Sequence, residues 1–226
     1  MTAPMSRTRS LLLAAALVGL TGCHSRYKKM SGRIGSVQPV VGNPGEPMVD
    51  VGGLGDTDIT GTAVEDAIDV VVGVGVAVKA AKVQTRLQRA VEPEEVSASL
   101  RSSILKAPAK RGLPHRISPK GKHRMQVEIV DYGVGVSSSG PVVQTTISVR
   151  IDRKRDGRRV YRATTSCEEP LANMPNIYIP GAEQIRTLQA LAQVQELNRE
   201  ELRAATLLGV ERCGEQVVDK MVRHAG

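Results

Sequence analysis

The sequence predicts an α+β fold, in which a small antiparallel sheet of three or more strands packs against helices. Three observations predict it. Apolar and polar residues alternate between residues 125 and 167, apolar residues recur at spacings of three and four on both sides of that region, and residues 23–61 have no sustained apolar period. We therefore expect a signal segment over 1–22, a flexible tether over 23–61 and one folded domain over 62–226.

The first 22 residues have the three parts of a secretory signal peptide. Basic residues come first, an apolar run follows, and small residues precede the expected cleavage point. The apolar run, Leu11–Leu20, has ten residues, whereas a helix needs about 20 to cross a bilayer core. We therefore interpret it as a cleaved signal and not as a permanent membrane-spanning helix.

Leu20-Thr21-Gly22-Cys23 closes this apolar run and resembles the lipobox of bacterial lipoproteins. The resemblance implies cleavage before Cys23 and acylation of that residue, with two or more acyl chains forming a stable membrane anchor. Resemblance to enterobacterial lipoproteins further implies export to the periplasmic face of the outer membrane, because His24 is not an aspartate. The alternative is an ordinary signal peptide followed by an unrelated cysteine.

Residues 24–61 are rich in glycine and proline, so the sequence predicts a flexible tether there. A flexible chain of that length spans roughly 35 Å, enough to hold a domain clear of the headgroups. Four basic residues lie close to the anchor, and each could add about 1 kcal/mol of attraction to an anionic membrane surface. These residues are Arg26, Lys28, Lys29 and Arg33.

The folded domain is expected to begin with a helix over about 63–90, because apolar residues recur there at helical spacing. The β-branched residues of 70–78 leave a strand as the alternative. Gly73 and Gly75 would let another backbone approach closely, either a neighbouring helix of the same domain or a protein partner.

A second helix is expected over 93–106, beginning at Pro93 and stopped by Pro108. The following segment, Lys106–Arg124, has seven lysines and arginines and no acidic residue, and we expect an extended basic loop. The candidate anion-binding residues are Lys110, Arg111, Arg116, Lys120, Lys122 and Arg124. The alternative is a charged loop that is merely solvated.

Three strands are expected over 125–136, 143–151 and 161–167, with a change of face near Asp131. A three-residue turn, Arg155–Gly157, keeps apolar residues on one face of the second hairpin.

This register pairs Ile151 with Tyr161 and Val149 with Ala163. It also predicts a second basic surface on the outer face of the sheet and at the tip of the hairpin. The residues of that surface are Arg150, Arg153, Lys154, Arg155, Arg158 and Arg162.

The chain is expected to continue with a loop over 168–181 and helices over 185–197 and 199–223, the second of which begins at a cap formed by Asn198 and Glu201. Cys213 falls on the face of the last helix that points to the sheet, and Cys167 falls on the apolar face of the third strand. We predict a disulfide between them in an oxidising compartment. The alternative is two small buried thiols.

Signatures of catalysis are missing from the sequence. Ser103-Ile104-Leu105-Lys106 matches the S-x-x-K of penicillin-binding proteins, but the companion motifs have no credible counterpart. The four histidines have no metal-ligand spacing. The chain has no Phe and no Trp, which argues against an aromatic platform for nucleic acid. We expect no enzyme activity, no cofactor, no metal and no nucleic-acid partner.

The order of elements over 93–223 resembles the small periplasmic α+β domains of outer-membrane lipoproteins, such as the lipopolysaccharide-assembly lipoprotein and the auxiliary lipoproteins of ABC-type lipid transporters. The resemblance implies a non-enzymatic accessory subunit that contacts a protein partner in the envelope, and anionic lipid. The net charge of +8 fits an anionic partner. The alternative function is a structural lipoprotein that links the outer membrane to acidic wall polymer.

Overall fold

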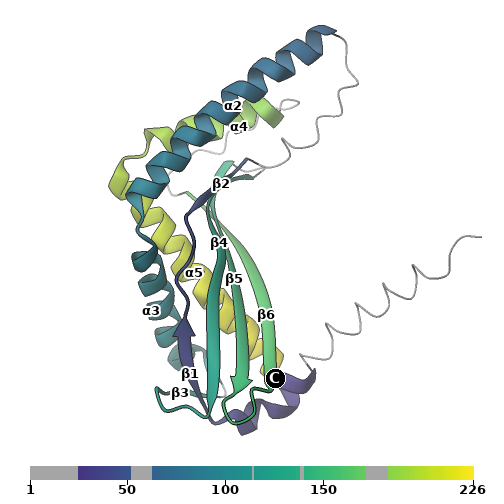
Figure 1. Ribbon diagram of the computed structural model, residues 1–226, viewed down its shortest axis with the longest axis vertical. Coiled ribbons are helices and arrows are strands. Elements are labelled where there is room, and N and C mark those ends of the chain that lie inside the picture. The colour runs from purple at the N-terminus through teal and green to yellow at the C-terminus, as the bar shows by residue number, and fades with distance from the viewer. Residues whose placement is uncertain (1–24, 52–62, 114, 138–139, 172–182) are drawn as a thin grey trace, which may run out of the picture.

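The computed structural model describes residues 25–51, 63–113, 115–137, 140–171 and 183–226 (Figure 1). A helix over 25–34 comes first. The further elements are β1 (Ser36–Val41), β2 (Met48–Asp50), α2 (Ala63–Ala90), α3 (Pro93–Arg111), β3 (Arg116–Ile117), β4 (His123–Ser137), β5 (Gly140–Arg153), β6 (Arg159–Pro170), α4 (Glu183–Glu196) and α5 (Arg199–Ala225).

The predicted α+β class is confirmed, but the sheet is larger than expected and mixed. Its strand order is β3-β1-β4-β5-β6, and β2 pairs with β4 off this path. The pairs β4–β5 and β5–β6 are antiparallel, as predicted, whereas β1 and β2 run parallel to β4. Of the three additional strands, β1 and β2 come from the segment that the sequence predicted to be a tether, and β3 comes from the predicted basic loop.

The predicted register of the β5–β6 hairpin is confirmed as far as Ile151. The predicted three-residue turn is wrong, because the ladder shifts there and pairs Asp152 with Arg159. Ile151 lies opposite Tyr161 and Val149 opposite Ala163. Gly157 has a φ of 64° at the turn, a left-handed conformation that favours glycine. The predicted change of face in β4 is confirmed by an irregularity in the ladder between Ile129 and Asp131.

The prediction of a flexible tether is wrong for residues 25–51. Tyr27 and Val37 have no exposed surface, and Ile34 is 1 % exposed. Their burial offsets the entropy of ordering a glycine- and proline-rich chain. Pro39 is tolerated in β1 because β3 pairs with only the first two residues of that strand, which leaves one side of it open at Pro39.

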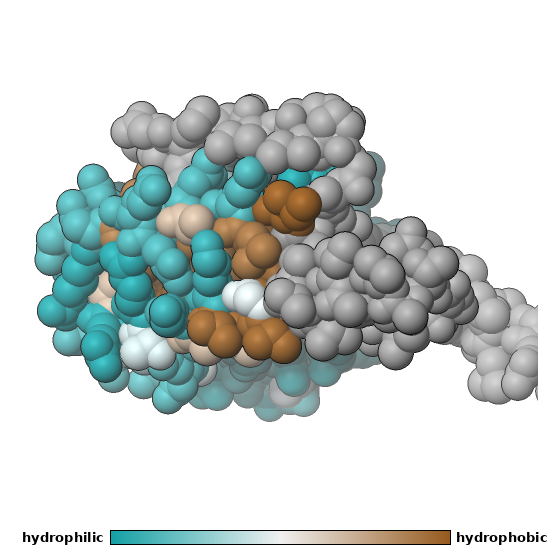
Figure 2. Space-filling model, turned by 90° about the horizontal axis from the view of Figure 1, so that it is seen from above, coloured by the Kyte–Doolittle hydropathy of each residue, from teal (hydrophilic) through white to brown (hydrophobic). Residues whose placement is uncertain are grey.

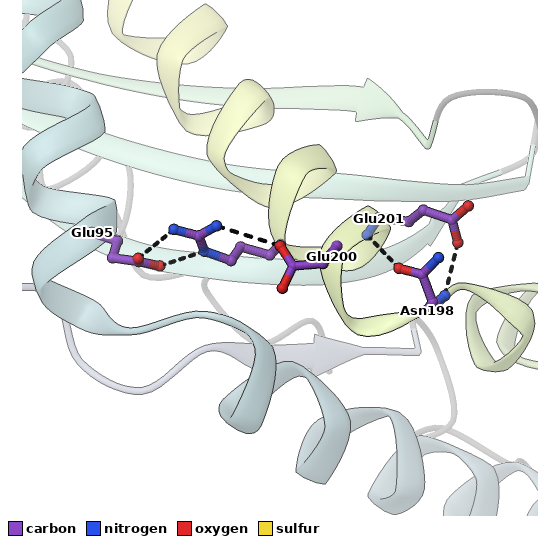
Figure 3. Close-up of polar contacts among 5 residues, drawn as sticks. Glu95, Asn198, Glu200 and Glu201 are labelled. Atoms are coloured by element: carbon purple, nitrogen blue, oxygen red, sulfur yellow. Dashed lines mark hydrogen bonds and ion pairs between the residues drawn. The ribbon is translucent and has the colours of Figure 1, made fainter.

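Helices α3 and α5 lie on one face of the sheet, and α2 and α4 lie side by side beyond one end of it (Figure 1). Arg203 of α5 donates two hydrogen bonds to the Glu95 carboxylate of α3 (Figure 3). Asn198 and Glu201 form the predicted capping box at the start of α5. The helical interpretation of 63–90 is confirmed over its strand alternative.

Helix α3 continues to Arg111, five residues beyond its predicted end. The helix passes through Pro108 and stops at Gly112, which has a φ of 70° and serves as a left-handed cap. The extended basic loop predicted over 106–124 is therefore wrong for 106–111. The loop prediction is also wrong for Arg116–Ile117 and for the residues from His123 onward, which form strands.

The predicted disulfide between Cys167 and Cys213 is present, with the two Cα atoms 5.6 Å apart. It joins β6 to α5 across the core, where Cys167 is 8 % exposed and Cys213 is fully buried. The predicted loop over 168–181 is wrong for its first residues, because β6 continues to Pro170. The remainder of that loop, 172–181, lies outside the described residues, as do residues 1–24.

Candidate anion-binding site

The helix over 25–34 is docked on the end of the sheet by aromatic side chains. The ring centroid of Tyr27 lies 4.3 Å from that of Tyr161 on β6 and 6.0 Å from that of His115. The Ser31 hydroxyl donates a 3.4 Å hydrogen bond to the carbonyl of Ala225 at the end of α5. The start of the described chain and its C-terminal helix therefore meet at one end of the molecule, as Figure 1 shows.

Backbone hydrogen bonds bring two turns to the same end. Arg116 donates to the carbonyl of Gly35, and Ser118 donates to that of Val37, so the chain before β4 lies against the start of β1. Lys154, in the β5–β6 turn, donates a 3.1 Å bond to the carbonyl of Lys122. We call residues 25–37, 116–124, 153–159 and 223–226 together the basic end.

The charge of this end is strongly one-sided. It contains 14 lysines and arginines and one acidic residue, Asp156. Twelve of the 14 are exposed, and the other two, Arg26 and Arg153, are half-buried. The whole chain carries a formal charge of +8, so the part outside the basic end is net negative. An anionic surface would therefore attract this end and repel the rest.

Two of the predicted anion-binding residues belong to α3, away from the loop in which they were expected. Arg111 forms ion pairs with Glu215 and Asp219 of α5. Hydrogen bonding to Asp219 raises the pKa of the Arg111 guanidinium above its ordinary value. Because two carboxylates already pair with it, Arg111 is poorly placed to bind a further anion. The side chain of Lys110 lies outside the described residues.

The other four predicted residues are exposed at the basic end. Arg116 lies on β3, Lys120 and Lys122 lie in the turn after it, and Arg124 lies on β4. Arg124 lies opposite Asp152 of the neighbouring strand β5.

The second basic surface predicted on the sheet is partly neutralised. The Arg150 guanidinium lies 2.6 Å from the Asp152 carboxylate, and Arg153 lies 3.5 Å from Asp156. A hydrogen bond from the backbone of Arg158 holds the pKa of Asp156 below its ordinary value, so this carboxylate stays charged. Lys154 and Arg155, two exposed cations of this surface, lie in the turn that contacts Lys122.

The two histidines of the predicted basic loop are buried and do not add to the positive surface. His115 is 4 % exposed and His123 is 7 % exposed. Burial lowers the pKa of His115 to about 4, with the nearby His123 adding to the shift, and burial also lowers the pKa of His123. Both imidazoles are therefore neutral at pH 7. Among the described residues, no group of three or more His, Cys, Asp or Glu side chains could hold a metal ion.

The S-x-x-K match is a structural feature of α3. Ser103 is 2 % exposed, donates a hydrogen bond to the carbonyl of Leu100 and packs against Gly214 of α5. Lys106 is exposed on the same helix. A hydroxyl that is buried and hydrogen-bonded within its own helix cannot reach a substrate. Ser103 and Lys106 therefore do not form a nucleophile and its general base.

A groove of about 420 Å³ lies on the face of the sheet opposite α3 and α5, far from the basic end. Its lining comes from β2, β4, β5 and β6 and includes the carboxyl groups of Asp50, Asp131 and Glu168. Thr146 and Ser166 face it and share a 3.1 Å hydrogen bond. The acidic lining makes the groove a poor site for an anion.

No family model matches the chain, and no curated protein matches it. Among solved structures, a Xanthomonas campestris protein described under the family model DUF330 has a TM-score of 0.35 at 14 % identity, over 79 % of this chain and 86 % of that one. A Caulobacter crescentus protein, provisionally described as a lipoprotein, has a TM-score of 0.32 at 14 % identity, over 58 % and 84 %. Lipoprotein GNA1162 of Neisseria meningitidis has a TM-score of 0.24 at 13 % identity, over 72 % and 99 %.

TM-scores below 0.5 are too low to transfer a fold or a function to this chain. What the chain does must therefore be inferred from its own residues. Among the described helices, none has the length and the apolar run that crossing a bilayer requires.

Sequence reasoning missed that three separate basic segments meet. Lys28 and Lys29 were identified beside the anchor, Lys120 and Lys122 in the loop, and Lys154 at the hairpin tip. The only sequence signal that could have joined them is the apolar content of Ser36–Val41, a stretch that is short, interrupted by proline and without a strand's regular alternation. A strand there would have brought the first segment to the edge of β4.

Proposed function

We propose that this chain is a lipid-anchored protein of the bacterial envelope, acylated on Cys23 and held on the periplasmic face of the outer membrane. The lipobox sequence supports acylation. The observation that carries the proposal is the position of Ser25, because this residue already belongs to a helix of the described fold, two residues after Cys23. An acyl chain on Cys23 would place the folded domain directly at the membrane, without an intervening tether.

Within that location we propose a non-enzymatic accessory role. The support is the domain's chemistry: its S-x-x-K serine is buried, its loop histidines are buried and its groove is acidic. A subunit of this kind would contact an anionic membrane at one end and a protein partner elsewhere.

The exposed face of α2 is where we expect the protein partner. Val74 is 59 % exposed and Val78 is 50 % exposed, and Ala77 and Ala81 continue the same stripe. Figure 2 views the molecule from the end where α2 and α4 lie and shows hydrophobic residues between the hydrophilic ones. Gly75 faces Leu188 of α4, so this glycine serves the packing within the domain.

The anchor is tested by replacing Cys23 with alanine in the producing cell. We expect the wild-type protein to fractionate with the outer membrane and to carry the mass of acyl chains on Cys23. The Cys23→Ala protein should lack that mass and leave the membrane fraction. Membrane attachment that survives the substitution would refute the anchor.

The protein partner is tested by photo-crosslinking in the cell. A crosslinker at Val78 should give a discrete adduct with one envelope protein, whereas a crosslinker at Gln88, exposed on the last turn of the same helix, should not. Equal adducts from both positions, or none from either, would count against this face. Co-sedimentation with purified cell wall would favour the alternative of a structural link to acidic wall polymer.

A further inference from the structure

We propose that the basic end binds the headgroups of anionic phospholipids in the anchoring membrane, and that it thereby fixes the orientation of the domain. The contact would be made at three places: the helix over 25–34, the turn over 118–122 and the turn over 153–158. This inference deepens the proposed function and uses its anchor only to decide which surface the basic end meets.

The first support is the distribution of charge. The basic end contains 14 of the 31 lysines and arginines of the chain and one acidic residue, while the remainder of the molecule is net negative. At physiological ionic strength the Debye length is about 8 Å, so only charges close to the surface contribute. Concentrating the positive charge at one end gives attraction in one orientation and repulsion in the opposite one.

The second support is that the key side chains are available. Lys29, Lys122 and Lys154 are exposed, and none of them takes part in the ion pairs between described side chains. They come from three different chain segments, which backbone hydrogen bonds hold together. Three separate contacts on a rigid body define a plane, whereas one basic segment would leave the domain free to swing.

The third support is the position of the anchor. Two peptide units hold the Cα atom of Cys23 within about 7 Å of that of Ser25. The exposed cations nearest to it, Lys28 and Lys29, belong to the helix over 25–34. The basic end is therefore the part of the domain that meets the headgroups first, which favours a membrane surface over a distant wall polymer.

The test is co-sedimentation with vesicles, using the mature chain, residues 23–226, with Cys23→Ala. This protein keeps every described residue and has no acyl chain, so binding is measured independently of acylation. We expect binding to phosphatidylcholine vesicles that contain about 30 % phosphatidylglycerol, and none to pure phosphatidylcholine. The triple variant Lys29→Gln, Lys122→Gln, Lys154→Gln should lose binding roughly 100-fold.

A matched control removes three exposed cations away from the basic end: Lys82→Gln, Arg89→Gln, Arg199→Gln. It should bind the anionic vesicles within about threefold of the parent protein. Equal losses of vesicle binding in both triple variants would overturn the proposal. Binding of the parent protein to pure phosphatidylcholine, or to purified wall but not to anionic vesicles, would also overturn it. Unchanged circular dichroism of each variant shows that the fold is kept.

The lipid anchor is tested by a separate measurement. Intact mass of the protein from cells reports acylation of Cys23, whereas the vesicle experiment reports the basic end. An acylated protein whose basic end ignores anionic vesicles would refute this inference and leave the anchor standing.

Discussion

Tyr27→Ala is expected to destabilise the whole domain, because the Tyr27 ring is part of the core. Its side chain is fully buried and packs against the rings of Tyr161 and His115. Truncating a buried aromatic side chain to alanine lowers the free energy of unfolding by about 3–5 kcal/mol, through lost apolar burial and the cavity that remains. In a flexible tether the same substitution would change that free energy by less than about 0.5 kcal/mol.

Urea unfolding of residues 23–226, followed by circular dichroism, measures the effect. Lys28→Ala is the matched control, since Lys28 is exposed on the same helix and should stay within about 0.5 kcal/mol of the parent. Tyr27→Phe should be close to neutral, because the buried Tyr27 hydroxyl has no hydrogen-bond partner among the described residues. A Tyr27→Ala protein as stable as the control would refute the docking of this helix.

Three further predictions concern the core and the sheet. Reducing the Cys167–Cys213 disulfide, whose cysteines are 46 residues apart, should lower the free energy of unfolding by about 4 kcal/mol, measured by urea unfolding with and without reductant; equal midpoints would contradict it. The pKa of His115 is lowered to about 4, so the unfolded chain binds more protons below pH 6.5, and stability should fall by about 3 kcal/mol as the pH drops from 6.5 to 4. His115→Gln should remove that part of the pH dependence, and parallel stability curves of the two proteins would contradict the assignment. Gly133→Ala should lower the free energy of unfolding by about 1–3 kcal/mol, because the new Cβ would lie 1.7 Å from the Met48 carbonyl oxygen. Gly32→Ala, with open space at its Cβ, should not destabilise the protein. Equal thermal midpoints of the two variants would refute the close approach of β2 to Gly133.

The strands and helices with strong periodicity were predictable from the sequence. The register of the β5–β6 hairpin followed from keeping Tyr161 on the apolar face, and the capping residues Asn198 and Glu201 marked the start of α5. The disulfide followed from placing Cys167 and Cys213 on facing surfaces. In each case the determining interactions are local, or follow from the burial of one face.

The N-terminal strands were not predictable from local pattern. β1 has six residues and β2 has three, and β1 contains a proline, so neither has the alternation that identifies a strand. Their pairing with β4 is set by long-range contacts, such as that of Val37 with His123. Composition favoured a flexible segment, and tertiary burial of Tyr27 and Ile34 overrode it.

The candidate site shows the same division between local and long-range information. The sequence identified each basic segment, and four of the six predicted anion-binding residues are exposed at the basic end. It missed that Arg111 would pair with acidic residues 104 and 108 positions further along the chain. Ion pairs between distant helices depend on the packing of α3 against α5, which no local pattern encodes.

In the proposed arrangement the folded domain stands directly on the membrane. Neutron reflectometry of the acylated protein on a supported bilayer containing anionic lipid measures the distance between them. We predict protein density that begins at the headgroups, because Ser25, two residues after Cys23, already belongs to the described fold. A protein-poor gap of roughly 35 Å between headgroups and domain, the span of a flexible chain over residues 24–61, would show that the domain does not stand on the membrane.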